Sequence, residues 1–119
     1  MQSVSAFAAA EDLQVISLDE LLQVHAPNVY LVKIDGDSMQ GAGIFDEDVV
    51  IVDKAIDARV GHIVIAAVNG EPVCKRLDYV GRQIVLRSEI ARYPPRFIME
   101  GDEFSVWGVV TYSLRSMVR

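Results

Sequence analysis

The chain has 119 residues, of which 51% are hydrophobic and 24% are charged, so it has room for one domain with a core of its own. This composition excludes an intrinsically disordered chain, which carries too little hydrophobic surface to fold. The formal net charge of −6 argues against direct binding to the phosphate backbone of DNA, since such binding needs a basic surface.

Cysteine usage and hydropathy indicate the compartment. The single cysteine, Cys74, has no partner for an intramolecular disulfide, as is typical of a protein in a reducing compartment. No hydrophobic run approaches the roughly 18–20 residues of a membrane span, and the first residues lack the basic start of a secretory signal. No Cys/His cluster has metal-ligand spacing, and no nucleotide-binding glycine motif occurs. We therefore expect a cytoplasmic protein without membrane contact, metal or other cofactor.

The N-terminal part of the chain contains an arm and a helix signal. Residues 1–12 are mostly small or polar and show no hydrophobic period, so we expect a flexible arm in front of a domain over residues 13–119. Ser17 and Glu20 have the S-x-x-E spacing of a capping box, in which the serine side chain accepts a backbone amide. This spacing predicts a short helix over about 18–24.

Runs of β-branched and hydrophobic residues follow, separated by turn signals. Asn69-Gly70 lies between two such runs and favours the positive φ angles of a two-residue turn, which predicts a β-hairpin. Gly108 predicts an interruption in the last strand. The predicted strands cover residues 29–34, 48–52, 63–68, 72–79, 83–87 and 104–114. Strands at this spacing, with one early helix, predict a mainly β single domain of twisted, barrel-like antiparallel strands.

Ser38 is a candidate nucleophile in the sequence Gly36-Asp37-Ser38-Met39, directly after the first predicted strand. A glycine in this turn allows backbone amides to approach a ligand closely, as an oxyanion hole requires. The alternative is a strand-ending turn that has only a local side-chain hydrogen bond. A serine nucleophile also needs a base that takes its proton.

Histidine is the usual base, but His25 and His62 come with no evident orienting acid. We expect both on the surface or at a strand end, although the aspartates near His62 leave a Ser/His/Asp arrangement open. Five acidic residues between the first strands do not follow an EF-hand pattern, and we assign them to turns. They are Asp46, Glu47, Asp48, Asp53 and Asp57.

Lysine is the other candidate base, provided that it is buried without a charged partner. Lys75 shares one face of its predicted strand with Val73, Leu77 and Tyr79, because side chains alternate along a strand. A lysine on a hydrophobic face either extends its ammonium group to solvent or is desolvated and neutral. Only the second state makes it a general base, and the residues alone leave both open.

Several stretches together resemble the LexA/UmuD family of Ser-Lys self-cleaving proteins. Lys75 follows Ser38 by 37 residues, in the position of the strand that carries the family's catalytic lysine. The resemblance covers about residues 13–114. The stretches that carry it are 32–39, 43–53, 61–66, 73–77 and the ending 106–110.

The resemblance implies a serine endopeptidase with a Ser-Lys dyad. Neutral Lys75 would take the proton of Ser38, whose oxygen attacks the scissile carbonyl, and the amide of Ser38 and a neighbouring amide would hold the oxyanion. Gly36, Asp37 and Met39 would form the nucleophile loop. The family usually has Asp where this chain has His62, which points to a difference in local turn chemistry or in pH response.

Within the family, the UmuD branch in its processed form is the nearest match, because no helix-turn-helix precedes the domain and residues 1–12 resemble the arm after the cleavage site. This implies a homodimer that binds a UmuC-type Y-family DNA polymerase as an accessory subunit in SOS translesion synthesis. The precursor would be cleaved with the help of a RecA filament on single-stranded DNA, and no sequence-specific DNA binding is expected. Two alternatives stay open, a peptidase that cleaves a relative in trans and the cleavage domain of a LexA-like repressor.

Overall fold

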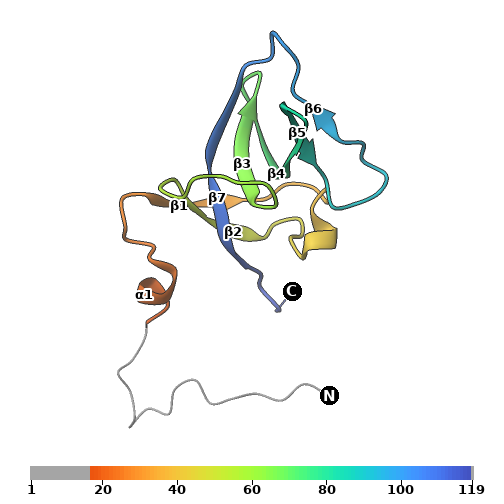
Figure 1. The fold of residues 1–119 in the computed structure, drawn as a ribbon. Coiled ribbons are helices and arrows are strands. Elements are labelled where there is room, and N and C mark those ends of the chain that lie inside the picture. Colours follow the sequence, from red (N-terminus) through yellow and green to blue (C-terminus); the bar gives the residue numbers. More distant parts are fainter. Residues whose placement is uncertain (1–16, 119) are drawn as a thin grey trace.

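The computed structural model describes residues 17–118, so the expected arm over residues 1–12 and the start of the domain at residue 13 lie outside the described residues. Strands dominate the described part of the chain (Figure 1). In chain order the elements are α1 (Leu18–Leu22), β1 (Val29–Lys33), the 3-10 helix η2 (Gln40–Ala42), β2 (Val49–Asp53), β3 (Ile63–Val68), β4 (Glu71–Val80), β5 (Gln83–Arg87), β6 (Arg96–Phe97) and β7 (Phe104–Leu114).

Helix α1 begins as the capping box predicts. The Oγ atom of Ser17 accepts a hydrogen bond from the amide of Glu20 at 3.1 Å. The helix ends at Leu22, two residues before the predicted end, because Gln23 adopts a left-handed conformation with φ of 55°. The amide of Gln23 then bonds to the carbonyl of Asp19, which closes the helix.

The seven strands form one antiparallel sheet in the order β1-β2-β7-β3-β4-β5-β6. The mainly β prediction is therefore confirmed. The edge strands β1 and β6 do not pair with each other, so the twisted sheet does not close into a barrel. The last strand, β7, lies in the middle of the sheet between β2 and β3 (Figure 1).

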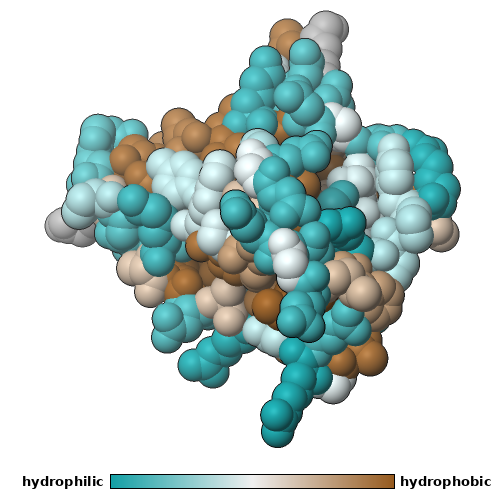
Figure 2. Space-filling model, turned by 90° about the horizontal axis from the view of Figure 1, so that it is seen from above, coloured by the Kyte–Doolittle hydropathy of each residue, from teal (hydrophilic) through white to brown (hydrophobic). Residues whose placement is uncertain are grey.

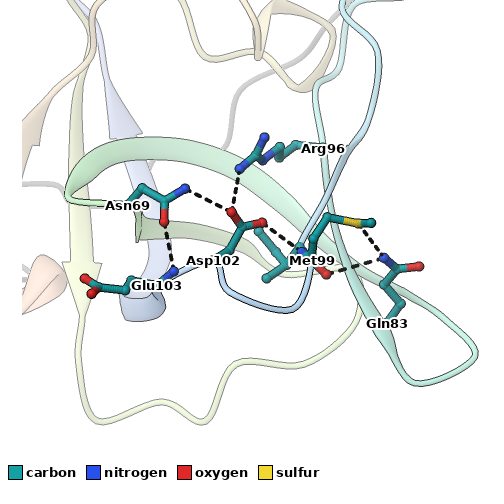
Figure 3. A network of polar contacts seen from close by, with 7 residues as sticks. Asn69, Gln83, Arg96, Met99, Asp102 and Glu103 are labelled. Atoms are coloured by element: carbon teal, nitrogen blue, oxygen red, sulfur yellow. Dashed lines mark hydrogen bonds and ion pairs between the residues drawn. The ribbon is translucent and has the colours of Figure 1, made fainter.

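The predicted hairpin joins β3 and β4. Its turn residues Asn69 and Gly70 both have positive φ angles, 52° and 81°, as a two-residue turn of this kind requires. The Asn69 side chain donates to Asp102 Oδ1 at 3.0 Å and accepts the amide of Glu103 at 2.9 Å (Figure 3). Asp102 also accepts hydrogen bonds from Arg96 and from the amide of Met99. This network ties the hairpin turn to the connection between β6 and β7.

Strand β7 continues through Gly108, where the sequence predicts an interruption. Its register shifts against β3 between Ile65 and Ala66, so the interruption is a β-bulge within one long strand. A Cβ atom on Gly108 would lie 2.6 Å from Cγ1 of Val52 and 3.0 Å from the carbonyl oxygen of Asp53. Glycine is therefore required for the close packing of β7 on β2.

Two hydrophobic clusters fill the two sides of β3. Ile65 belongs to the cluster that includes Met39, whereas Val64 and Ala66 belong to the other, as expected for a continuous hydrophobic strand that is buried on both faces. The first cluster consists of Ile34, Met39, Ile44, Val50, Val52 and Ile65. The second consists of Val64, Ala66, Val68, Leu77, Leu86 and Val109. Met39, with 2% of its surface exposed, connects the first cluster to the candidate nucleophile.

The surface has no single hydrophobic face in the view from above. Hydrophobic areas lie between hydrophilic side chains there (Figure 2). In the described part of the chain, no α-helix has the length and hydropathy of a membrane span.

Candidate active site

Ser38 lies in the loop that leads from β1 to η2. Gly36 has φ of 92°, a conformation that favours glycine, and its amide donates to Oδ1 of Asp46 at 2.7 Å. On the other side of Ser38, Met39 is buried in the first hydrophobic cluster. The half-buried serine is thus held between a braced turn and a core residue.

Ser38 and Lys75 line the same cavity, whose volume is about 320 Å³. They come from distant parts of the chain, the loop after β1 and the first half of β4. This half of β4 has an open edge, because β5 pairs only with Arg76 and the residues after it. The cavity is also lined by Val32, Met39, Ile65, Val73 and Cys74.

Lys75 is half-buried, and its surroundings make the charged form less favourable than it is in water. Desolvation by burial lowers the pKa of Lys75, and the neighbouring Cys74 acts in the opposite direction. The Nζ atom donates to Oγ of Ser88 at 3.0 Å and lies 6.0 Å from the centre of the Tyr93 ring. Among residues 17–118, Lys75 takes part in no ion pair. Lys75 is therefore partly desolvated and has no charged partner among the described residues.

Cys74, next to Lys75, also borders the cavity. Burial raises the pKa of its thiol to about 11, although Lys75 acts in the opposite direction. The thiol therefore stays protonated at neutral pH, and since the thiolate is the reactive form, Cys74 is a poor nucleophile there.

The backbone amides around Ser38 differ in whether they already have an acceptor. The amide of Gly36 is used within the loop by Asp46. In contrast, the amides of Asp37, Ser38 and Met39 donate to no acceptor within the part of the chain that the structure describes. The Asp37 side chain has a structural role, since its carboxylate accepts a hydrogen bond from the Tyr93 hydroxyl at 2.7 Å and pairs with Arg92.

The loop after β5 packs on the nucleophile loop. The amide of Glu89 donates to the carbonyl of Ser38 at 2.7 Å, and the carbonyl of Glu89 accepts the amide of Gly41 at 3.0 Å. A Cβ atom on Gly41 would collide with that carbonyl, so glycine permits this close approach. The Glu89 side chain pairs with Arg76 of β4.

Sequence reasoning missed Ser88, which contacts the candidate base. A signal was present, because counting outward from the two-residue turn Gly81-Arg82 places Ser88 opposite Lys75. The observed register agrees, as it pairs Val80 with Gln83 and Arg76 with Arg87.

The structure brings neither histidine to Ser38. His25 is exposed and bonds to Asp19 through Nε2 at 3.0 Å. Nδ1 of His62 accepts the amide of Arg59 at 3.1 Å, and His62 does not line the cavity that contains Ser38. The Ser/His/Asp alternative therefore has no support. The bond to Arg59 is one that an aspartate could also accept, so His62 acts in a local turn.

Asp46, Asp48 and Asp53 accept hydrogen bonds in turns, and Asp48 also pairs with Arg115. Oδ1 of Asp53 accepts the side chain of Asn28 at 2.7 Å and the amide of Ala55 at 2.8 Å. Asp48 accepts the amide of Phe45 at 2.9 Å. No group of three or more His, Cys, Asp or Glu side chains within residues 17–118 is arranged to hold a metal ion.

The chain is similar to known proteins over nearly its whole length. The profile of the Peptidase S24-like family matches residues 3–111. The LexA repressor of Bordetella avium (strain 197N) is 34% identical over 113 residues, which are 94% of this chain and 53% of the repressor. Protein MucA of Salmonella typhimurium is 32% identical over 108 residues, which are 90% of this chain and 73% of MucA.

The matched region contains Ser38, Lys75 and most of the sheet. The chain spans about half the length of the LexA repressors that it matches. Relatives of both kinds, LexA and MucA, are similar at almost the same identity, so the comparisons identify the family and do not single out the UmuD branch. The chain belongs to the Peptidase S24-like family.

Proposed function

We propose that this chain is a Ser-Lys serine endopeptidase domain of the self-cleaving kind, with Ser38 as the nucleophile and Lys75 as the general base. One observation carries the proposal. Ser38 and Lys75 line the same cavity, and the lysine is partly desolvated without a carboxylate partner among the described residues. A lysine in this environment is neutral in a larger fraction of molecules at a given pH than a lysine in water.

The reaction follows from these groups. Nζ of neutral Lys75 takes the proton from Oγ of Ser38 while Oγ bonds to the scissile carbonyl carbon. The carbonyl oxygen becomes an oxyanion, which the free amides of the nucleophile loop would stabilise. The ammonium of Lys75 then gives the proton to the leaving amine as the C–N bond breaks. Water hydrolyses the resulting ester and releases Ser38, with Lys75 again as the base.

A fluorophosphonate probe tests the proposal without a known peptide substrate. Oγ of Ser38 would attack the phosphorus, fluoride would leave, and Lys75 would take the proton. We expect one adduct on Ser38 whose mass is that of the probe less HF, formed at a rate that rises with pH because the lysine must be neutral. Ser38→Ala and Lys75→Met should each abolish labelling, whereas Ser105→Ala, on the exposed part of β7, should leave it unchanged.

Cleavage in trans is the second measurement. The substrate is the LexA repressor of Bordetella avium with its own nucleophile replaced, and cleavage is followed by mass spectrometry. Loss of cleavage in both Ser38→Ala and Lys75→Met supports the proposal. Cleavage or labelling that survives either substitution contradicts it, and so does an unlabelled wild-type protein.

We also propose a biological role, that of an accessory subunit of an error-prone translesion DNA polymerase. The similarity to MucA, which is 32% identical over 108 residues, supports this role. In this role the chain is a cytoplasmic homodimer that binds a UmuC-type Y-family polymerase. A RecA filament on single-stranded DNA would promote cleavage of its precursor.

Co-expression with a UmuC-type polymerase separates this role from that of a repressor domain. A complex of two chains with one polymerase, measured by size-exclusion chromatography with mass determination, supports the polymerase role. A dimer that does not bind the polymerase supports the cleavage domain of a LexA-like repressor instead.

A further inference from the structure

The loop after β5 provides a hydroxyl group that contacts the candidate base. Nζ of Lys75 donates to Oγ of Ser88 at 3.0 Å, and the ring of Tyr93, from the same loop, lies 6.0 Å from Nζ. Within residues 17–118, no other hydrogen bond or ion pair involves the Lys75 side chain. Ser88 is thus the polar side chain to which the amine donates among the described residues.

The backbone holds Ser88 near both members of the candidate dyad. The ladder between β4 and β5 ends at Arg76 and Arg87, so Ser88 leaves the sheet opposite Lys75. The next residue, Glu89, donates its amide to the carbonyl of Ser38 at 2.7 Å. The dipeptide Ser88-Glu89 therefore contacts the base through its first residue and the nucleophile loop through its second.

A neutral amine has two N–H bonds and one lone pair, and it rotates about the Cε–Nζ bond unless a partner holds it. If one N–H is donated to a fixed oxygen, the lone pair is restricted to few directions, and general-base catalysis depends on such alignment. We propose that Ser88 is a positioning residue whose hydroxyl accepts one N–H of Lys75 and directs the lone pair toward Oγ of Ser38. This inference rests on the proposed Ser-Lys function.

The same contact affects the charge of Lys75. A hydroxyl oxygen stabilises an ammonium group more than a neutral amine, so removing it should make the charged form of Lys75 less favourable. Cys74 on the same strand and Tyr93 on the loop also face Lys75. Further ionisable groups line the two cavities beside Lys75, namely Lys33, Asp35, Glu71 and Arg96. Substitution of Ser88 leaves all of these groups in place, so a change in titration reports on the hydroxyl.

The test measures the rate of fluorophosphonate labelling of Ser38 between pH 6 and pH 10.5. We expect Ser88→Ala to lower the plateau rate at high pH about ten-fold and to shift the midpoint of the profile to lower pH. Ser88→Thr keeps the hydroxyl and should restore both quantities. Ser88→Cys, which offers only a weak acceptor, should behave like Ser88→Ala. It takes the place of Ser88→Ala in the test if that variant does not fold. Ser105→Ala is the matched control and should match the wild type.

Two results would overturn the role of Ser88 alone. One is an unchanged plateau and midpoint in Ser88→Ala and Ser88→Cys. The other is a lower plateau without a shifted midpoint that Ser88→Thr does not restore, which would indicate general damage to the fold. A wild-type protein that is not labelled would instead overturn the proposed function, and the positioning role with it. The pKa of Lys75, measured by NMR of its 13Cε in the Ser38→Ala protein, reports on the contact without any reaction and should be lower when Ser88 is also replaced by Ala.

Discussion

Arg115 holds Asp48 through two hydrogen bonds, from Nε to Oδ1 at 2.9 Å and from Nη2 to Oδ2 at 3.0 Å. Asp48 is fully buried, directly before β2. Nη2 of Arg115 also donates to the carbonyl of Gly43 at 2.7 Å, and the guanidinium lies 4.0 Å from the centre of the Phe45 ring. The segment after β7 is thus attached to the loop that follows the candidate nucleophile.

Removing Arg115 should destabilise the fold, since it leaves a buried carboxylate without its charged partner. We expect Arg115→Ala to lower Tm by roughly 5–10 °C, as measured by thermal denaturation. Arg82→Ala, in the exposed turn between β4 and β5, is the matched control and should change Tm by less than about 2 °C. Equal effects of the two substitutions would show that the Asp48 pair does not matter for stability.

Stability should fall in acid because three aspartates are ionised more readily in the folded state. Hydrogen bonds from Arg115, Arg87 and Asn69 are the main causes that lower the pKa of Asp48, Asp78 and Asp102, respectively. A folded-state pKa below the unfolded value of about 3.9 means that the unfolded chain binds more protons. This stabilisation is complete above about pH 4 to 5 and is lost as the pH falls through the folded-state values.

Urea denaturation between pH 7 and pH 2.5 measures this dependence. Asp102→Asn should be less stable than the wild type at pH 7, because it loses the pairing with Arg96, and the difference should shrink toward pH 3. A constant difference over this range would contradict the expected linkage.

Gly108→Ala should destabilise the centre of the sheet. The new methyl group would lie 2.6 Å from Cγ1 of Val52, so β7 and β2 must separate. We expect a loss of about 1–3 kcal/mol in the free energy of unfolding, measured by denaturant titration. Ser105→Ala on the same strand is the comparison and should cost less than about 0.5 kcal/mol. A Gly108→Ala protein as stable as Ser105→Ala would refute the packing argument.

Lys75→Met should abolish labelling of Ser38 and stabilise the fold at neutral pH. Burial disfavours the charged lysine, so folding at pH 7 carries a cost that a hydrophobic side chain of similar length avoids. Because the folded-state pKa is below the unfolded value, this cost is greatest at neutral pH and decreases as the pH rises toward 10. The Tm difference between Lys75→Met and the wild type should therefore be positive at pH 7 and smaller at pH 10. A lower Tm of the variant at pH 7 would contradict the desolvation of Lys75.

Cys74 should react slowly with a disulfide reagent while the protein is folded. A pKa of about 11 leaves well under 1% thiolate at pH 8, whereas an ordinary thiol with a pKa near 8.5 is about one quarter ionised there. Unfolding in urea should increase the rate at least about ten-fold. Equal rates in the folded and unfolded states would contradict the burial of this thiol.

Local sequence signals predicted the elements that depend on neighbouring residues. Asn69-Gly70 defined the β3–β4 hairpin because a turn with two positive φ angles suits these residues. Strand β2 was predicted one residue early, because Asp48 looks like the start of the strand but serves as a buried partner of Arg115. The central place of β7 and the open sheet could not be predicted, since strand order depends on contacts between distant residues.

At the candidate site too, features that depend on local sequence were predictable and features that depend on tertiary contacts were not. The motif around Ser38 and the alternation around Lys75 made both residues candidates, the family resemblance paired them, and the structure places them on one cavity. The bracing of this site by Glu89 and Asp37 was not predictable, because the path of the loop after β5 is set by tertiary contacts.

The position of β7 determines when, during synthesis, Ser38 and Lys75 can come together. β7 lies between β2 and β3, so it joins two halves of the sheet. One half contains β1 and β2, with the Ser38 loop between them, and the other contains β3 and β4, with Lys75. A ribosome releases β7 after all the other strands, and domains fold once their full set of contacts is available. Ser38 and Lys75 are therefore brought to one cavity only when synthesis of the domain is nearly complete.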